Sequence, residues 1–189
     1  MLLVALTAMS GLTSCNYNSL VEKQQGVDQA WAQVENQYQR RYDLIPNLVS
    51  TVKGYAAHES EVFSQIAEAR SKAGGIVNID SSITDDPEKM AQFQKVQDTL
   101  GGALQRLLSI SENYPDLKAN QNFLALQDQL EGTENRIAVE RKRYNDAARA
   151  FNTKIRSFPT VMFASNFGFK AKAYFTASEQ AQTAPKVEF

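Results

Sequence analysis

A regular alternation of apolar side chains, three and four residues apart, runs through the first half of this chain and limits the folds that it can adopt. It extends from Val27 to Ala73, about seven heptads. Its positions are Val27, Trp31, Val34, Tyr38, Arg41, Ile45, Leu48, Val52, Tyr55, Glu59, Val62, Ile66, Ala69 and Ala73. This spacing places one mostly apolar stripe along a helix, as in coiled coils and helical bundles. We therefore predict an all-α fold, an antiparallel up-down bundle of long helices.

The first helix is expected to extend from residue 18 to residue 73 as one element. Pro46 lies inside it and removes one backbone hydrogen bond. The apolar spacing continues through Ile45 and Leu48 without a change of phase, so we expect a kink at Pro46 and no chain reversal. Gly74 and Gly75 should end the helix, because glycine is common just past a helix C-terminus.

Two further long helices are predicted in the middle of the chain. Asp86 and Pro87 have the residue types of an N-cap and a first helical position, so a second helix should begin there and stop before Tyr114. A third helix, with apolar positions from Phe123 to Phe151, should run antiparallel to the second because the connection is short. Residues 74–85 are expected to form a loop, with a brief extended segment at residues 76–77.

The N-terminus is the most informative part of the chain about location. Residues 1–12 are almost wholly apolar or small, and as a helix they would reach about 18 Å, less than a bilayer core. This length is typical of a signal-peptide core, although no Lys or Arg precedes Lys23. We expect residues 1–14 to be a signal peptide and residues 15–189 a single helical domain with a polar tail from about residue 176.

The only cysteine, Cys15, follows Leu12, Thr13 and Ser14. This pattern resembles the lipobox of bacterial lipoproteins, in which the cysteine is lipidated and becomes the first residue of the mature protein. Two or three acyl chains hold a protein at a bilayer far more firmly than one. An inert cysteine near the chain end is the alternative. The resemblance implies a lipid anchor at Cys15, on the periplasmic or extracellular side of a bacterial membrane.

Three charged residues, Arg41, Glu59 and Glu140, occupy positions in the apolar stripes. An unpaired buried charge is costly, so each could meet an opposite charge or a polar group on a neighbouring helix. The alternative is a splayed, hydrated part of the bundle. Either arrangement gives these residues a structural role and no catalytic one.

The segment 158–175 is rich in aromatic side chains. Pro159 could open a short fourth helix that Gly168 would close. The aromatic residues are Phe158, Phe163, Phe167, Phe169, Tyr174 and Phe175. They could close one end of the bundle, or they could form an exposed patch for a protein partner.

The composition argues against several function classes. A net charge of −1 supplies no basic face for nucleic acid. The single histidine, His58, excludes the Glu-x-x-His pairs of a di-iron bundle and leaves no credible nucleophile–base arrangement. We therefore expect no enzyme activity and no metal or other cofactor.

Three segments carry a family resemblance. VENQYQRRYDLIPNLVSTVKGYAAHE, NFLALQDQLEGTENRIAVERKRYNDAARAFN and FPTVMFASNFGFKAKAYF together resemble the LemA family of bacterial membrane-anchored proteins. The resemblance covers residues 20–175, and the APKVEF end is similar too. The residues that match the family's motif blocks are Arg40, Arg41, Asp43, Pro46, Asn47, Glu134, Asn135, Arg136, Tyr144 and Asn145. It implies an all-α antiparallel bundle held at the envelope by its N-terminus, and it implies no reaction.

From these observations we expect a non-enzymatic, lipid-anchored scaffold of the bacterial envelope that recruits or steadies a membrane protein partner. The alternative is a bundle that binds a small ligand between its helices, as sensory domains do. An apolar pocket with convergent polar groups would favour that alternative, and a solid core would count against it.

Overall fold

The computed structural model describes residues 2–77 and 81–176, with side chains described from residue 17 except at residues 75–77 and 81. All regular elements in these ranges are helical, which confirms the all-α prediction. The α-helices are α1 (Leu2–Lys53), α2 (Ser60–Val77), α3 (Pro87–Ile110), α4 (Pro115–Lys118) and α5 (Gln121–Arg156). Short 3₁₀ turns occupy η1 (Ser81–Asp85), η2 (Ser111–Asn113) and η3 (Thr160–Met162).

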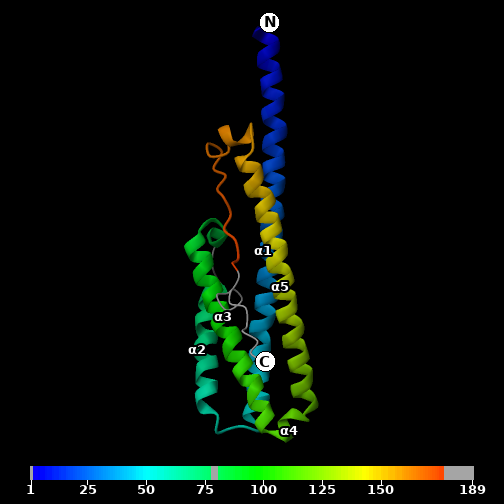
Figure 1. Ribbon diagram of the computed structural model, residues 1–189, viewed down its shortest axis with the longest axis vertical. Coiled ribbons are helices and arrows are strands. Elements are labelled where there is room, and N and C mark those ends of the chain that lie inside the picture. The colour runs from blue at the N-terminus through cyan, green and yellow to red at the C-terminus, as the bar shows by residue number, and fades with distance from the viewer. Residues whose placement is uncertain (1, 78–80, 177–189) are drawn as a thin grey trace, which may run out of the picture.

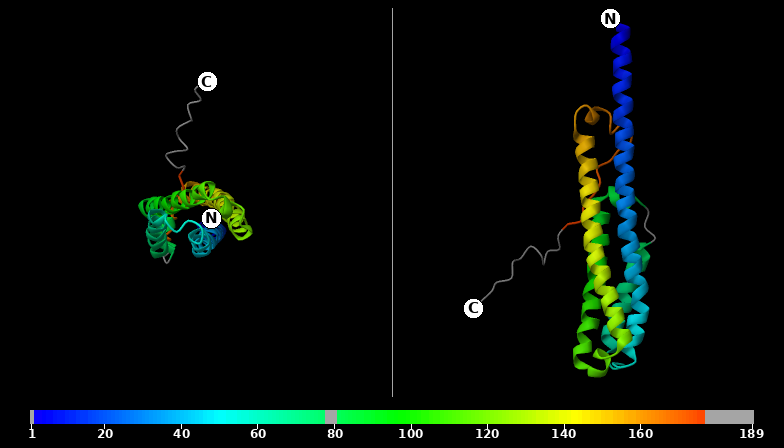
Figure 2. Two further views of the ribbon diagram at one scale, coloured as in Figure 1. Left: turned by 90° about the horizontal axis from the view of Figure 1, so that it is seen from below. Right: turned by 90° about the vertical axis from the view of Figure 1, so that its right-hand side faces the viewer.

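The long helices lie side by side along one axis (Figure 1). α1 descends from the N-terminus, α2 returns, α3 descends again and α5 rises beside α1. The most extensive packing joins α1 to α5 and α2 to α3. The first residues of α1 project beyond the rest of the bundle, as both side views show (Figure 2).

The predicted bounds of the first helix, residues 18–73, are wrong at both ends. The observed helix α1 begins at Leu2 and ends at Lys53, and the chain reverses over residues 54–59 before α2. Val52 O accepts from both Tyr55 N and Ala56 N, at 3.0 and 2.9 Å, so the regular ladder stops there. Pro46 lies inside α1 without ending it. The prediction of no reversal at Pro46 is therefore correct, but the reversal occurs eight residues later.

The region after the reversal also differs from the prediction. The buried stripe of α2 contains the predicted Ile66, Ala69 and Ala73, but it begins at Phe63 and not at the predicted Val62. α2 then continues through Gly74 to Val77, so neither the glycine stop nor the extended segment at residues 76–77 is present. A Cβ on Gly74 would lie 2.8 Å from the Tyr42 hydroxyl oxygen, so the glycine accommodates α1 at this contact.

The other helix starts follow local capping rules. The Asp86 carboxylate accepts from Glu88 N at 2.9 Å and Lys89 N at 3.2 Å, and Pro87 follows at the first helical position. This confirms the predicted start of α3. Asn120 caps α5 in the same way, by accepting from Phe123 N at 3.0 Å.

The predicted short fourth helix is absent. Residues 158–168 form the 3₁₀ turn η3 and isolated turns, among them Ala164 N to Thr160 O at 2.9 Å and Gly168 N to Ser165 O at 3.0 Å. Gly168 has a φ of +79°, a left-handed conformation that suits glycine. The chain must reverse within a few residues to return along α5, which leaves no room for a regular helix.

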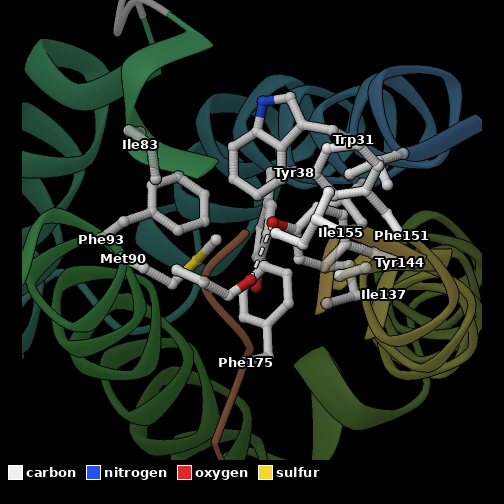
Figure 3. Packing of buried hydrophobic residues seen from close by; sticks show 14 of the residues in the cluster. Trp31, Tyr38, Ile83, Met90, Phe93, Ile137, Tyr144, Phe151, Ile155 and Phe175 are labelled. Carbon is white, nitrogen blue, oxygen red and sulfur yellow. Dashed lines mark hydrogen bonds between the residues drawn. The ribbon is translucent and has the colours of Figure 1, made fainter. Parts of the chain in front are cut away.

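Buried apolar residues form two clusters along the bundle. One lies toward the projecting end of α1 and joins α1, the beginning of α3, α5 and the C-terminal segment (Figure 3). The other joins the C-terminal half of α1 to α2, α3, α4 and the beginning of α5. In the first cluster the Phe175 ring stacks on Trp31, with centroids 5.9 Å apart, and meets Tyr144 edge-on at 5.5 Å.

Candidate functional site

A polar layer around Arg41 lies between the two apolar clusters. Arg41 Nη1 is 3.1 Å from Glu134 Oε1 on α5, and its Nη2 donates to both the backbone and the side-chain oxygen of Gln97 on α3. The guanidinium also lies 5.0 Å from the Tyr38 ring centroid. Arg41 is 3% exposed, whereas the Glu134 side chain is 42% exposed. One buried cation thus connects three long helices.

The other two charged residues from the sequence stripes are placed differently. Glu59 lies in the turn before α2 and accepts from the Tyr114 hydroxyl at 3.2 Å. Glu140 pairs with Arg143, at 2.7 Å, within α5 itself. The structure therefore does not bring Arg41, Glu59 and Glu140 together, and the inter-helix partner expected for Glu140 is replaced by one on its own helix.

An open groove follows this polar layer between α3 and α5. Its volume is about 1030 Å³. Tyr38 and Arg41 of α1 contribute to its lining, together with Gly101 and Gly102 on α3 and Arg141 on α5. α3 and α5 are not among the extensively packed helix pairs, so this side of the bundle is less closed than the others. A Cβ on Gly102 would meet no atom within 4 Å, which is consistent with an open wall.

Charge along the groove has a positive excess. Arg41 pairs with Glu134, and Arg141 Nη1 lies 3.9 Å from Asp98 Oδ1. Lys95 and Arg106 also line the groove, and Arg106 Nη1 donates to the neutral side chain of Gln65 at 3.0 Å. The groove is therefore polar, with two more cations than anions along its lining.

Three side-chain amides hold the C-terminal segment against the bundle. Asn152 donates to Lys172 O at 2.8 Å and accepts from Lys172 N at 2.7 Å. Asn145 makes the same pair of bonds with Phe175, each at 2.9 Å. Gln94 of α3 donates to Thr176 O at 2.8 Å and accepts from Thr176 N at 3.1 Å. Each amide satisfies both backbone groups of one residue, as a neighbouring strand would.

An ion pair between the buried Lys172 and the exposed Asp85 completes this attachment. Lys172 Nζ lies 2.6 Å from Asp85 Oδ1, and Ala173 N donates to Thr84 O at 2.7 Å. The Tyr144 hydroxyl donates to Ala173 O at 2.9 Å, and burial raises the pKa of that phenol. Burial likewise raises the pKa of Tyr38, partly opposed by Arg141 and Arg41. The chain from 172 to 176 is thus fixed along α5 and α3.

Sequence reasoning singled out Asn145 only as a residue of the family's motif blocks, and it assigned a role to none of the three amides. Asn145 and Asn152 are seven residues apart, so they lie on one face of α5, and that repeat was an available signal. Gln94 lies on another helix and carries no comparable pattern. Its role follows from tertiary packing alone.

The six aromatic residues of the predicted patch divide between core and surface. Phe175 is buried, and Phe163 and Phe169 pack against the first apolar cluster. Phe158, Phe167 and Tyr174 are exposed. One subset therefore belongs to the core, and another is exposed on the surface, where a role in binding a partner stays a prediction.

Two of the exposed members, Phe158 and Phe167, lie at one end of the molecule, which we call the tip and define as residues 158–167. Val161 and Met162 are exposed there too, and Tyr17 of α1 contacts the Phe167 and Phe169 rings at 5.3 and 5.9 Å. Figure 1 shows the tip at the end of α5, beside α1 where that helix continues past the bundle.

Several other predictions fall outside what the structure describes. The backbone of Cys15 belongs to α1, but its side chain is not among those described, and most of the predicted polar tail lies outside the described residues.

His58 is exposed in the turn between α1 and α2. Within the described residues, no helix is long and apolar enough to span a membrane, and no cluster of three or more potential metal ligands occurs.

Comparison with known proteins gives consistent matches. The model of the LemA family matches residues 30–189. A protein LemA of Metamycoplasma hominis is 31% identical over 162 residues, covering 86% of this chain and 69% of that protein. Magnetosome protein MamQ 2 of Paramagnetospirillum magneticum is 28% identical, covering 88% and 67%. Magnetosome protein MamQ of Magnetospirillum gryphiswaldense is 26% identical, covering 91% and 69%.

Proposed function

The chain belongs to the LemA family, and from this premise we propose that it is a non-enzymatic helical scaffold that recruits or steadies a protein partner at the bacterial envelope. The family and the MamQ relatives indicate a membrane-associated helical protein. Beyond that statement, we propose a lipid anchor at Cys15 and a position on the periplasmic or extracellular side. The lipobox-like sequence before Cys15 supports the anchor.

The open groove between α3 and α5 is the observation that carries the scaffold proposal. The side between α3 and α5 is less closed than the others, so its polar groups are accessible to another chain. Gly101 and Gly102 give this side a stretch of wall that has no side chains. Because the groove has a positive excess from Lys95 and Arg106, we propose that it receives an acidic segment of an envelope protein. Its open, polar lining gives less support to a small ligand, which apolar enclosed pockets hold better.

A site-specific crosslinking experiment tests this assignment. A photo-crosslinking amino acid replaces Gln105, an exposed residue in the groove, or Val139, an exposed residue of α5 that does not line it. In native membranes, the groove position should give a discrete protein adduct that the Val139 position does not give. Gly102→Trp, which fills the groove where a Cβ has free space, should abolish that adduct without unfolding the bundle.

A charge-reversal variant provides a second test in the same crosslinking experiment. Lys95→Glu with Arg106→Glu should also remove the adduct, because the groove then repels an acidic segment. Identical adducts from both crosslinker positions, or an adduct that survives Gly102→Trp, would contradict the proposed groove.

The anchor has its own test in the native host. Cys15→Ser, or globomycin treatment of the wild type, should leave an uncleaved precursor because signal removal then fails. Cell fractionation and the mass of the intact protein measure this outcome. A mature and fully soluble protein in the Cys15→Ser strain would overturn the lipoprotein assignment.

A further inference from the structure

The tip presents an unusual concentration of large apolar side chains to solvent. Phe158 is 81% exposed, Met162 70%, Phe167 56% and Val161 50%. All four lie within ten residues of chain, and they surround turns that the backbone hydrogen bonds of residues 160–168 hold in place. Exposed apolar side chains concentrated in one short segment indicate a surface that contacts a membrane or another protein.

The chain segment that contains the tip carries charge of one sign. Residues 147–176 contain Arg149, Lys154, Arg156, Lys170 and Lys172 and no Asp or Glu. Lys172 is buried and paired with Asp85, but Arg156 and Lys170, which flank the tip in sequence, are exposed. Apolar side chains flanked by Arg and Lys are the combination that binds the interface of an anionic bilayer.

The position of the tip in the molecule also favours contact with a bilayer. Tyr17 of α1 contacts Phe167, so the tip lies level with the beginning of the packed part of α1. α1 continues past it toward the N-terminus (Figure 2), and no charged side chain precedes Glu22 in the sequence. The chain end proposed to attach to the membrane therefore leaves the bundle beside the exposed apolar residues. This step rests on the proposed membrane attachment.

We propose that the tip is a lipid-contacting surface, in which Phe158, Val161, Met162 and Phe167 enter the headgroup region of an anionic bilayer and Arg156 and Lys170 meet lipid phosphates. Aromatic and aliphatic side chains at this depth release water, while the guanidinium and ammonium groups stay at the polar boundary. The long axis of the bundle then has two attachment points at one end, the N-terminal segment and the tip.

Site-specific fluorescence on the full chain tests this proposal. Cys15→Ser removes the native thiol, and Met162→Cys introduces one at the tip for an environment-sensitive label. His58→Cys, exposed in the turn at the opposite end of the bundle, is the matched control. Vesicles contain phosphatidylcholine alone or an equal mixture with phosphatidylglycerol, and brominated acyl chains serve as quenchers.

We expect the label at residue 162 to shift to the blue and to be quenched on mixed vesicles, and the label at residue 58 to do neither. The shift should be smaller on phosphatidylcholine alone and in high salt. Replacing Phe158, Val161, Met162 and Phe167 with serine should weaken partitioning to mixed vesicles by about tenfold, without loss of helical content, because these side chains are exposed.

Vesicle flotation of the labelled chain, together with the precursor assay on Cys15→Ser described above, separates failure of this proposal from failure of the lipid anchor. The labelled chain lacks Cys15, so its binding to protein-free vesicles reports the tip and not the anchor. If this chain does not float, or floats while the label at residue 162 stays unquenched, the lipid-contacting tip is wrong, whatever the precursor assay shows for the anchor. A blue shift in native membranes but not in protein-free vesicles would overturn the lipid contact and assign the tip to a protein partner.

Discussion

Arg41 is the residue on which the centre of the bundle depends. It is buried between two apolar clusters, and its guanidinium donates to groups on both α3 and α5. A buried cation of this kind specifies which helices meet and in which register, since any other alignment would leave it without acceptors.

Replacing Arg41 with alanine should therefore destabilise the protein. Alanine opens a cavity and leaves the buried Gln97 side-chain oxygen without its donor, so we expect a loss of about 3 kcal/mol in the free energy of unfolding. Chemical denaturation monitored by circular dichroism measures it. Lys142→Ala, which removes an exposed pair on α5, should leave stability unchanged. Equal effects of the two substitutions would contradict the structural role of Arg41.

Tyr144 gives a pH-dependent signal. Burial raises the pKa of its phenol above the ordinary value of 10.0, which applies to the unfolded chain. Above that pH, the unfolded state loses a proton that the folded state keeps, so stability falls as pH rises. Below it, both states are protonated and Tyr144 contributes no pH dependence.

Tyr144→Phe should flatten this decline above pH 10.0. The variant also lacks the hydrogen bond to Ala173 O, so it should be less stable by about 1 kcal/mol at neutral pH. Urea denaturation across the alkaline range measures both effects, and Tyr17→Phe, at an exposed ring, is the control. A decline equal to that of the wild type would show that the titration of Tyr144 does not govern it.

At the scale of the elements, α3 carries two glycines in its middle, beside the groove. Gly102→Ala should stabilise the protein by about 1 kcal/mol, because alanine has a higher helix propensity and its Cβ meets no atom within 4 Å. Thermal unfolding measures the change. Gly168→Ala should act in the opposite direction, since the φ of +79° disfavours a side chain. A destabilised Gly102→Ala variant would mean that this part of α3 is not open.

The amide pairs that hold the C-terminal segment allow a second test at this scale. Asn152→Leu leaves the backbone N–H and C=O of buried Lys172 without those partners, at a cost of about 2–3 kcal/mol. Hydrogen exchange should increase at residues 172–176 more than in α2. Thr153→Ala, its exposed neighbour on α5, should change neither quantity. Unaltered exchange at Lys172 N would contradict the role of Asn152.

Local signals predicted some elements and not others. Asp86 and Pro87 are adjacent and have the residue types of an N-cap and a first helical position, so the beginning of α3 could be predicted from them. The reversal at residues 54–59 was missed because its residues nearly maintain the apolar spacing, and Gly54 alone is a weak signal. The attachment of residues 172–176 depends on side chains from two other helices, which no local pattern reveals.

The candidate site shows the same limit at the scale of the whole molecule. Arg41 could be recognised as a charge in an apolar stripe, but its partner Glu134 is 93 residues away in the sequence. The groove between α3 and α5 results from how four helices share their contacts. Neither the spacing within α3 nor that within α5 predicts that this side would be left more open.

The two apolar clusters raise the question of whether the bundle unfolds in one step. α1 and α5 pass through both clusters, so we expect a single cooperative transition. Fluorescence of the only tryptophan, Trp31, reports the first cluster, and far-ultraviolet circular dichroism reports all helices. The two denaturation curves should coincide. An earlier fluorescence transition would show that the first cluster unfolds independently.

The continuity of α1 has a mechanical consequence. The part of it from Cys15 to Lys53, which remains after the proposed signal cleavage, forms a rod of about 58 Å without a break before the reversal after Lys53. A tilt of about 10° at the membrane end displaces the far end by about 10 Å, since a rigid rod of that length acts as a lever. Small changes of orientation at the membrane would therefore become large changes in the reach of the bundle, and thus in which neighbouring proteins it can touch.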